Sequence, residues 1–157
     1  MRLLETDPAA AEARFRDALA KGPSADAIVG LASLLKGRGE TEEASALLDR
    51  APADRRAKVM KHRIFLDDFA ARHDESELRA EVGREPSSPR ARYRWGVMLA
   101  ARGRHQDALD ELLESVRLDR DFADGAARKA VLAVFDLLGL DSPATREYQR
   151  KLSMLLF

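Results

Sequence analysis

GRHQDALDELLESV (residues 103–116) has a small residue at Ala108, a large apolar residue four positions later at Leu112, and another small residue at Ser115. On an α-helix these offsets place the three side chains on one face. The small side chains let a neighbouring helix approach closely, and the large one fills the space between the two helices. We therefore expect this helix to bury one face against a second helix.

The same spacing occurs in two earlier stretches. They are AEARFRDALAKGP (residues 11–23), with Ala11, Phe15 and Ala18, and GETEEASALLDRAP (residues 39–52), with Ala44, Leu48 and Ala51. Repeated in this way, the pattern resembles the second helix of a tetratricopeptide repeat, a helix pair that cannot bury its apolar face alone and must stack on its neighbours. Stacked helical repeats generally bind other proteins, so the pattern bears on function as well as on fold.

The spacing of apolar residues predicts helices almost everywhere, and no stretch alternates with period two for long enough to indicate a strand. Asp7 is suited to cap the first helix, with Pro8 in its first turn. Ser24 or Asp26 is suited to start the second helix, and Thr41 to cap the third. We predict an all-α, tetratricopeptide-like solenoid of about nine helices in antiparallel pairs. It forms one domain, 1–157, with units near 1–23, 24–51, 52–86, 87–120 and 121–157.

Two units are expected to be unusual. The pair at 52–86 stands where a third repeat belongs but lacks the small-large-small pattern, which suggests a local change in superhelical curvature. The first unit keeps only Leu3 and Leu4 of its first helix. We therefore expect the face of Phe15 and Leu19 to be partly exposed or covered by another copy of the chain, which would give a homodimer through the N-terminal end.

Composition excludes several classes of protein. Apolar residues make up 45% of the chain and charged residues 34%, with no cysteine and no apolar run long enough to span a membrane. We expect a cytoplasmic, bacterial protein with no membrane partner, no cofactor and no metal. The three histidines, His62, His73 and His105, lack the spacing of metal ligands. Adjacent carboxylates such as Asp67 and Asp68 diverge on a helix. No catalytic or nucleotide-binding motif occurs. An enzyme is therefore not expected.

Charge is unevenly distributed although the formal net charge is zero. The balance of basic over acidic side chains is −3 in residues 1–49, +6 in 50–104 and −3 in 105–157. This central basic belt either attracts an acidic partner or forms a solvated face that pairs with the acidic thirds. Binding of nucleic acid is disfavoured, because the whole chain is neutral and the belt contains few aromatic residues.

The candidate partner-binding residues surround the repeat unit at 87–120: Arg90, Arg92, Arg94, Trp95, Arg102 and Arg104. Arginine binds carboxylates in a forked geometry, so these side chains could hold an acidic peptide. The alternative is a salt-paired surface, and Trp95 beside Gly96 is expected to pack between helices rather than to contact a partner. For the terminal Phe157 we favour packing on the last helix over an exposed position.

The last third resembles one particular family. The stretches GRHQDALDELLESVRLDRDF (103–122), DGAARKAVLAVFDLLG (124–139) and DSPATREYQRKLSMLLF (141–157) are similar to the C-terminal region of the thioredoxin–tetratricopeptide proteins called YbbN or CnoX, the chaperedoxins. The matching tail residues are Tyr148, Arg150, Lys151, Leu152, Leu155, Leu156 and Phe157. The thioredoxin domain and its Cys-x-x-Cys motif are absent, so we expect the isolated C-terminal domain of a longer protein.

What the resemblance implies is a holdase or co-chaperone role without catalysis. Members of that family bind unfolding clients and deliver them to the chaperonin and the Hsp70 system, so unfolded clients and these chaperones are the expected partners. The alternative hypothesis is a scaffold or oligomerisation module without chaperone activity.

Overall fold

The computed structural model describes residues 7–157, and within them every regular element is a helix. The α-helices are α2 (Pro8–Lys21), α3 (Ala25–Gly37), α4 (Thr41–Leu48), α5 (Arg55–Arg72), α6 (Glu75–Arg84), α7 (Pro89–Ala101), α8 (His105–Leu118), α9 (Ala126–Leu138) and α10 (Pro143–Leu156), with a short 3₁₀ turn, η1 (Phe122–Asp124). The all-α fold and the number of helices are thus confirmed for the described part of the chain. Leu3 and Leu4 lie outside it.

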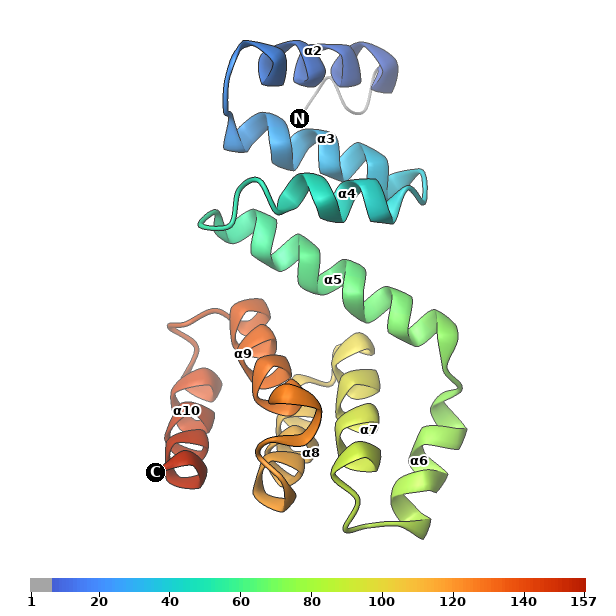
Figure 1. Cartoon of the computed structure of the whole chain (residues 1–157), viewed down its shortest axis with the longest axis vertical. Coiled ribbons are helices and arrows are strands. Elements are labelled where there is room, and N and C mark those ends of the chain that lie inside the picture. The colour runs from blue at the N-terminus through green and yellow to red at the C-terminus, as the bar shows by residue number, and fades with distance from the viewer. Residues whose placement is uncertain (1–6) are drawn as a thin grey trace. The chain divides into compact units, whose positions relative to one another are not determined.

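Contacts divide the chain into two compact units, residues 1–64 and 65–157, with the boundary inside α5. In the first unit α3 packs against both α2 and α4 (Figure 1). In the second, α7 packs against α6 and α8, and α8 also contacts α9 and α10. The change in curvature expected at α5 and α6, and the single domain, stay predictions.

Most of the predicted helix starts are confirmed. The carboxylate of Asp7 accepts a hydrogen bond from the amide of Ala10, and the hydroxyl of Ser24 does the same for Ala27. The prediction for Thr41 was wrong, because Thr41 is the first helical residue and the preceding Glu40 makes no side-chain cap. The caps at Asp7 and Ser24 satisfy backbone amides that have no hydrogen-bond partner inside the helix.

The repeated pattern forms the core of the first unit. Ala44 and Leu48 are fully buried in a cluster with Ile28, Leu31 and Leu35 of α3. The ring of Phe15, on α2, lies directly over Gly30 of α3, where an added Cβ would overlap it. Phe15 and Leu19 of α2 are half-buried.

In the second unit the pattern locks α8 onto α7. Ala108, Leu112 and Ser115 are all fully buried. A Cβ at Gly96 of α7 would lie 2.7 Å from Cγ of Leu112 and 3.3 Å from the carbonyl oxygen of Ala108. The hydroxyl of Ser115 donates a 2.8 Å hydrogen bond to the carbonyl of Pro89, which satisfies a buried polar group. The close approach of α7 and α8 therefore requires a residue without a side chain at 96.

Replacing Leu112 by Ala should destabilise the protein by about 2–5 kcal/mol, because it removes a fully buried side chain and leaves a cavity against Gly96. Urea unfolding followed by circular dichroism measures the change. A loss below about 1 kcal/mol would contradict the placement of Leu112 in the core.

Candidate functional site

The predicted arginines of α7 connect neighbouring helices. Nη1 of Arg92 lies 2.9 Å from Glu111 on α8, and Nη1 of Arg94 lies 2.9 Å from Glu81 on α6. All four side chains are about four-fifths buried, so these pairs are better shielded from water than ordinary surface salt bridges. Arg92 and Arg94 thus point to opposite sides of α7 and hold its two neighbours.

The remaining candidates do not gather into one groove. Arg102 pairs with Glu75 at 3.2 Å, and Arg104 pairs with Asp107 at 2.7 Å in the first turn of α8. Arg90 is exposed and makes no ion pair with the residues from 7 to 157. Four of the five arginines are therefore neutralised by carboxylates of the same unit. This favours the salt-paired alternative, while a binding role for these side chains stays a prediction.

Trp95 is part of the core rather than an exposed anchor. It is only 9% exposed and packs in the cluster that contains Leu99, Leu109 and Leu112. The burial of Trp95 supports the interpretation that it packs between helices.

An open depression lies on the first unit between α2, α3 and α4, and we call it the α2–α4 groove. Its floor is apolar, with the half-buried Leu19 and the buried Leu31 and Leu47. Its other lining residues are Arg16, Ala20, Glu43, Ala46 and Arg50. The floor suits an apolar side chain of a bound peptide, and the rim carries both signs of charge.

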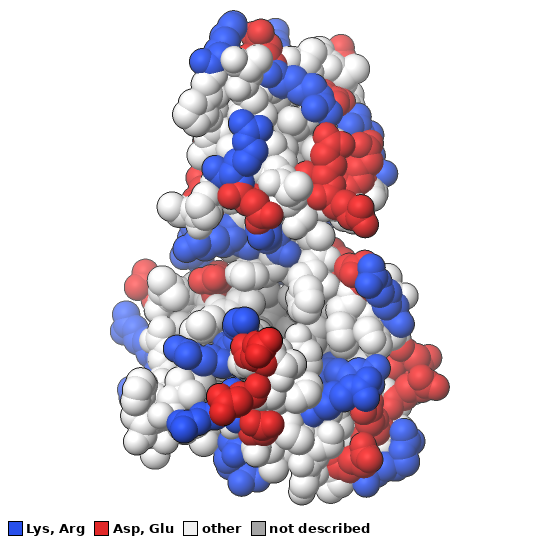
Figure 2. Space-filling model, viewed as in Figure 1, with Lys and Arg blue, Asp and Glu red and all other residues white. Residues whose placement is uncertain are grey.

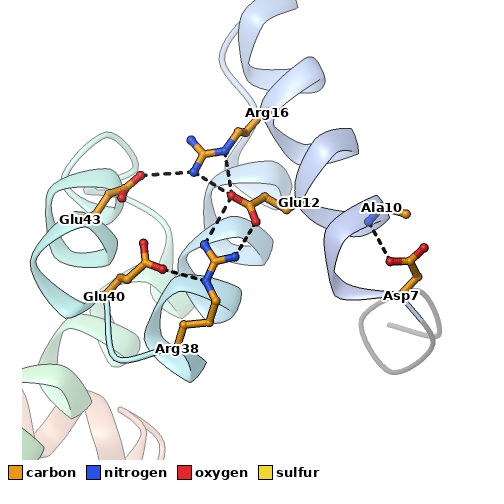
Figure 3. A network of polar contacts seen from close by, with 7 residues as sticks. All are labelled: Asp7, Ala10, Glu12, Arg16, Arg38, Glu40 and Glu43. Carbon is orange, nitrogen blue, oxygen red and sulfur yellow. Dashed lines mark hydrogen bonds and ion pairs between the residues drawn. The ribbon is translucent and has the colours of Figure 1, made fainter.

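A network around Glu12 fixes the edge of this groove (Figure 3). The Glu12 carboxylate accepts hydrogen bonds from Arg38 at 2.7 Å and from Arg16 at 2.9 Å. Arg16 also reaches Glu43 at 3.4 Å, and Arg38 pairs with Glu40 at 2.9 Å. Hydrogen bonds from Arg38 and then Arg16 lower the pKa of Glu12 to about 2. The network ties α2 to the turn between α3 and α4 and holds Arg16 on the rim.

A second depression lies between α3 and α5, and we call it the α3–α5 groove. It is lined by Ser33, Lys36, Arg55, Arg56, Val59, Met60 and Arg63. Figure 2 shows a band of Lys and Arg side chains over the first half of α5. Sequence reasoning identified the basic belt but placed the candidate residues on α7 and in the turn that follows it. The run of basic residues from 55 to 63 could have pointed to this groove in the sequence. The position of Lys36 beside that run could not be inferred, because it depends on the packing of α3 against α5.

A third depression, near the C-terminus, carries both signs of charge, since Arg120 and Arg128 share it with Asp121 and Asp124. Phe157 also lines it, yet its side chain is fully exposed. The favoured prediction that Phe157 packs on the last helix was therefore wrong. The preceding Leu152 is buried instead, and it already occupies the apolar face of α10.

The tail residues that resemble the chaperedoxins serve mainly to pack α10. The hydroxyl of Tyr148 donates a 2.7 Å hydrogen bond to Asp110 on α8, and Nζ of Lys151 lies 4.5 Å from the centre of the Tyr148 ring. Burial, and then the bond to Asp110, raises the pKa of Tyr148. Leu155 and Leu156 are half-buried, and Arg150 is exposed. These contacts give the tail residues a structural role in packing α10. They do not define a binding partner.

His73, which follows α5, contacts Phe69 of that helix. Nδ1 of His73 lies 2.9 Å from the carbonyl of Phe69, and the two rings stack. Within residues 7–157 no three His, Asp or Glu side chains are grouped closely enough to bind a metal ion. Nor does any helix in that range combine the length and apolar character that crossing a membrane requires.

Stacked helix pairs with open grooves define a class of repeat proteins that bind other proteins and typically have no catalytic activity. Comparison with known families assigns the chain within this class. Residues 68–157, more than half of the chain, and separately residues 2–59 match families described as tetratricopeptide repeat, so the chain belongs to the tetratricopeptide repeat proteins. It is a protein–protein interaction module.

One curated relative is a much larger protein. "Cellulose synthase operon protein C" of Xanthomonas axonopodis pv. citri (strain 306) is 40% identical over 93 residues, which cover 51% of this chain. The match spans only 6% of that protein's length. The relative therefore shares a stretch of repeats with this chain.

The Glu12 network predicts a specific dependence on pH. Because the pKa of Glu12 is lowered from 4.5 to about 2 on folding, its carboxylate stabilises the protein fully above pH 5. That contribution is lost as the pH falls through 4.5 towards 2, where the unfolded chain binds the proton first. Glu12→Gln should therefore be less stable than the wild type at pH 7, and the difference should narrow across this window.

Urea unfolding of both proteins at a series of pH values measures the difference. Glu12→Gln can also be made in a protein that already carries Arg38→Gln. There the difference in stability that Glu12→Gln causes should depend less on pH, since Arg38 is the main cause of the lowered pKa of Glu12. A difference that is constant from pH 7 to pH 2.5 would contradict the role of the network.

Proposed function

We propose that this module holds partly unfolded segments of client proteins, as a holdase or co-chaperone related to the thioredoxin–tetratricopeptide proteins, with a cytoplasmic location. The observation that carries the proposal is the α2–α4 groove, with Leu19, Leu31 and Leu47 beneath a rim of both charges. An apolar floor accepts many side chains, because burial of apolar area is not directional. Unfolded clients offer such side chains without a common sequence.

The mixed rim supports broad rather than selective binding. Arg16 and Glu43 face each other at 3.4 Å across the edge of the groove, and Arg50 is exposed beside them. Peptides of either charge can find a partner there, while burial supplies roughly 25 cal/mol per Å². A few apolar contacts would then give the weak, reversible affinity that a holdase needs. The similarity of the C-terminal tail adds support for the family, and the chaperonin and the Hsp70 system are the proposed recipients.

The alternative is a scaffold that assembles proteins without chaperone activity. It is supported by the half-buried Phe15 and Leu19 on α2, which a second copy could cover. The relative in a cellulose synthase operon is consistent with a scaffold as well. A concentration-dependent mass in analytical ultracentrifugation, together with no effect on client aggregation, would favour this alternative.

The holdase proposal predicts that the chain suppresses the aggregation of a thermally unfolding client, such as citrate synthase, measured by light scattering at equimolar amounts. Ala20 and Ala46 are exposed and line the groove, so Ala20→Gln with Ala46→Gln fills it without touching the core. This double variant should suppress aggregation several-fold less well.

Ala80→Gln is the matched control, because Ala80 is exposed on α6 and lies outside the groove. It should behave like the wild type. Equal suppression by all three proteins would show that the groove is not the client site. No suppression by the wild type would contradict the holdase proposal itself.

A further inference from the structure

The depression near the C-terminus lies where α10 ends beside the start of α9, because these two helices run antiparallel (Figure 1). We call it the α9–α10 pocket. Its volume is about 380 Å³, which is in the range of sites that hold a small organic group. Gly125 lines the pocket, and a Cβ added there would meet no atom within 4 Å. The space above this glycine is therefore open to a side chain from outside.

The last turn of α10 presents large apolar side chains beside this pocket. Met154 is 82% exposed, and Phe157, which lines the pocket, is fully exposed. The amide of Phe157 donates a 3.0 Å hydrogen bond to the carbonyl of Ser153, so the helical geometry extends to this residue. Three positions apart, Met154 and Phe157 lie on one side of the turn. Apolar side chains exposed together in this way indicate a contact surface.

The rest of the exposed face of α10 is polar. From 146 to 153 its exposed residues are Arg146, Glu147, Gln149, Arg150, Lys151 and Ser153. A helix that stacks another helix pair presents an apolar face along its length. The apolar side chains of the last turn therefore suit a local contact with a partner rather than a continuation of the stacking.

The rim of the pocket carries two arginines and two aspartates: Arg120, Arg128, Asp121 and Asp124. All four side chains are exposed, and none of them forms an ion pair with the described residues, 7–157. Arg120 donates a 3.4 Å hydrogen bond to the carbonyl oxygen of Leu156, which leaves the charge of its guanidinium group uncompensated. The four charges are therefore available to a partner.

The balance of these charges limits the kind of partner that fits. A rim with equal numbers of both signs selects neither a strongly acidic nor a strongly basic surface. Its best partner carries both signs around an exposed aromatic side chain, and this chain offers that combination at the α9–α10 pocket itself. In a twofold-symmetric contact a patch meets its own copy, so it must be self-complementary. Two arginines and two aspartates around one pocket satisfy that condition.

We propose that two copies of the chain associate around a twofold axis through their α9–α10 pockets. The ring of Phe157 of each copy enters the pocket of the other, and the arginines of each rim meet the aspartates of the other. The apolar side chains supply the affinity, and the charges fix the orientation. The inference goes beyond the proposed holdase function and does not depend on it. A dimer carries two α2–α4 grooves, which allows one client to be held at two points.

Sedimentation equilibrium of the 157-residue chain over a series of concentrations tests the contact. The weight-average mass should rise from 17.4 kDa towards twice that value. Phe157→Ser should raise the Kd of the dimer about tenfold or more, because it removes an aromatic ring from both halves of the contact. The matched control is Leu140→Ser, since Leu140 is 56% exposed and lies outside the pocket. This control should leave the Kd unchanged.

Charge reversal tests which surfaces meet. Arg128→Asp leaves one arginine with three aspartates on the rim, and Asp121→Arg leaves three arginines with one aspartate. Each variant alone should dimerise about tenfold more weakly, because like charges then meet across the axis. An equimolar mixture of the two should recover dimers with a Kd close to that of the wild type, since the altered rims complement each other. Arg79→Asp, on the exposed face of α6, is the control and should have no effect.

Three results would overturn the inference. The first is a wild-type chain that keeps the mass of one copy up to about 1 mM, which corresponds to very weak association. The second is a dimer that Phe157→Ser and the charge reversals leave unchanged, because its contact would then lie elsewhere, as on the face of Phe15 and Leu19. The third is a mixture of Arg128→Asp and Asp121→Arg that fails to recover dimers, since the two rims would then not face each other.

Discussion

This structure depends on the close approach of neighbouring helices. It occurs where a glycine on one helix leaves space that a large side chain of the other helix fills. Gly96 has no room for a Cβ because Leu112 occupies that space, and Gly30 has none because the ring of Phe15 lies over it. The two contacts occur in different units and between different helices, yet they have the same physical form. Each sets the distance between neighbouring helices.

Charge acts in opposite ways in the two units. In the second unit Arg92 and Arg94 form shielded pairs that join α7 to α8 and α6. In the first unit the Glu12 network joins α2 to the α3–α4 turn, whereas Lys36 and three arginines line the groove between α3 and α5, where Arg56 pairs with Asp26 and Asp54. Similar numbers of arginines therefore serve packing in one place and present a charged surface in another. Which of the two roles an arginine has depends on whether a carboxylate of a neighbouring helix lies beside it.

The sequence allowed much of the fold to be predicted, because helical periodicity and caps depend on nearby residues. Asp7 and Ser24 were assigned to helix ends that the structure contains. The site was harder to predict, since pairing depends on residues that are distant in sequence. Arg94 meets Glu81 thirteen positions away, and Lys36 lies with the arginines of α5, so neither neutralisation nor clustering could be inferred from local charge.

The most direct test of this account is a double-mutant cycle between positions 96 and 112, measured as free energies of unfolding in urea. If Leu112 occupies the space of the missing Cβ, Gly96→Ala should destabilise the wild type clearly more than it destabilises the variant with alanine at position 112. In that variant the overlap with Leu112 is gone, and the 3.3 Å approach to the carbonyl oxygen of Ala108 and the gain in helix propensity remain. The expected coupling energy is about 1–3 kcal/mol. Effects of Gly96→Ala that agree within about 0.5 kcal/mol in the two backgrounds would contradict the account, because contacts that do not share space are additive.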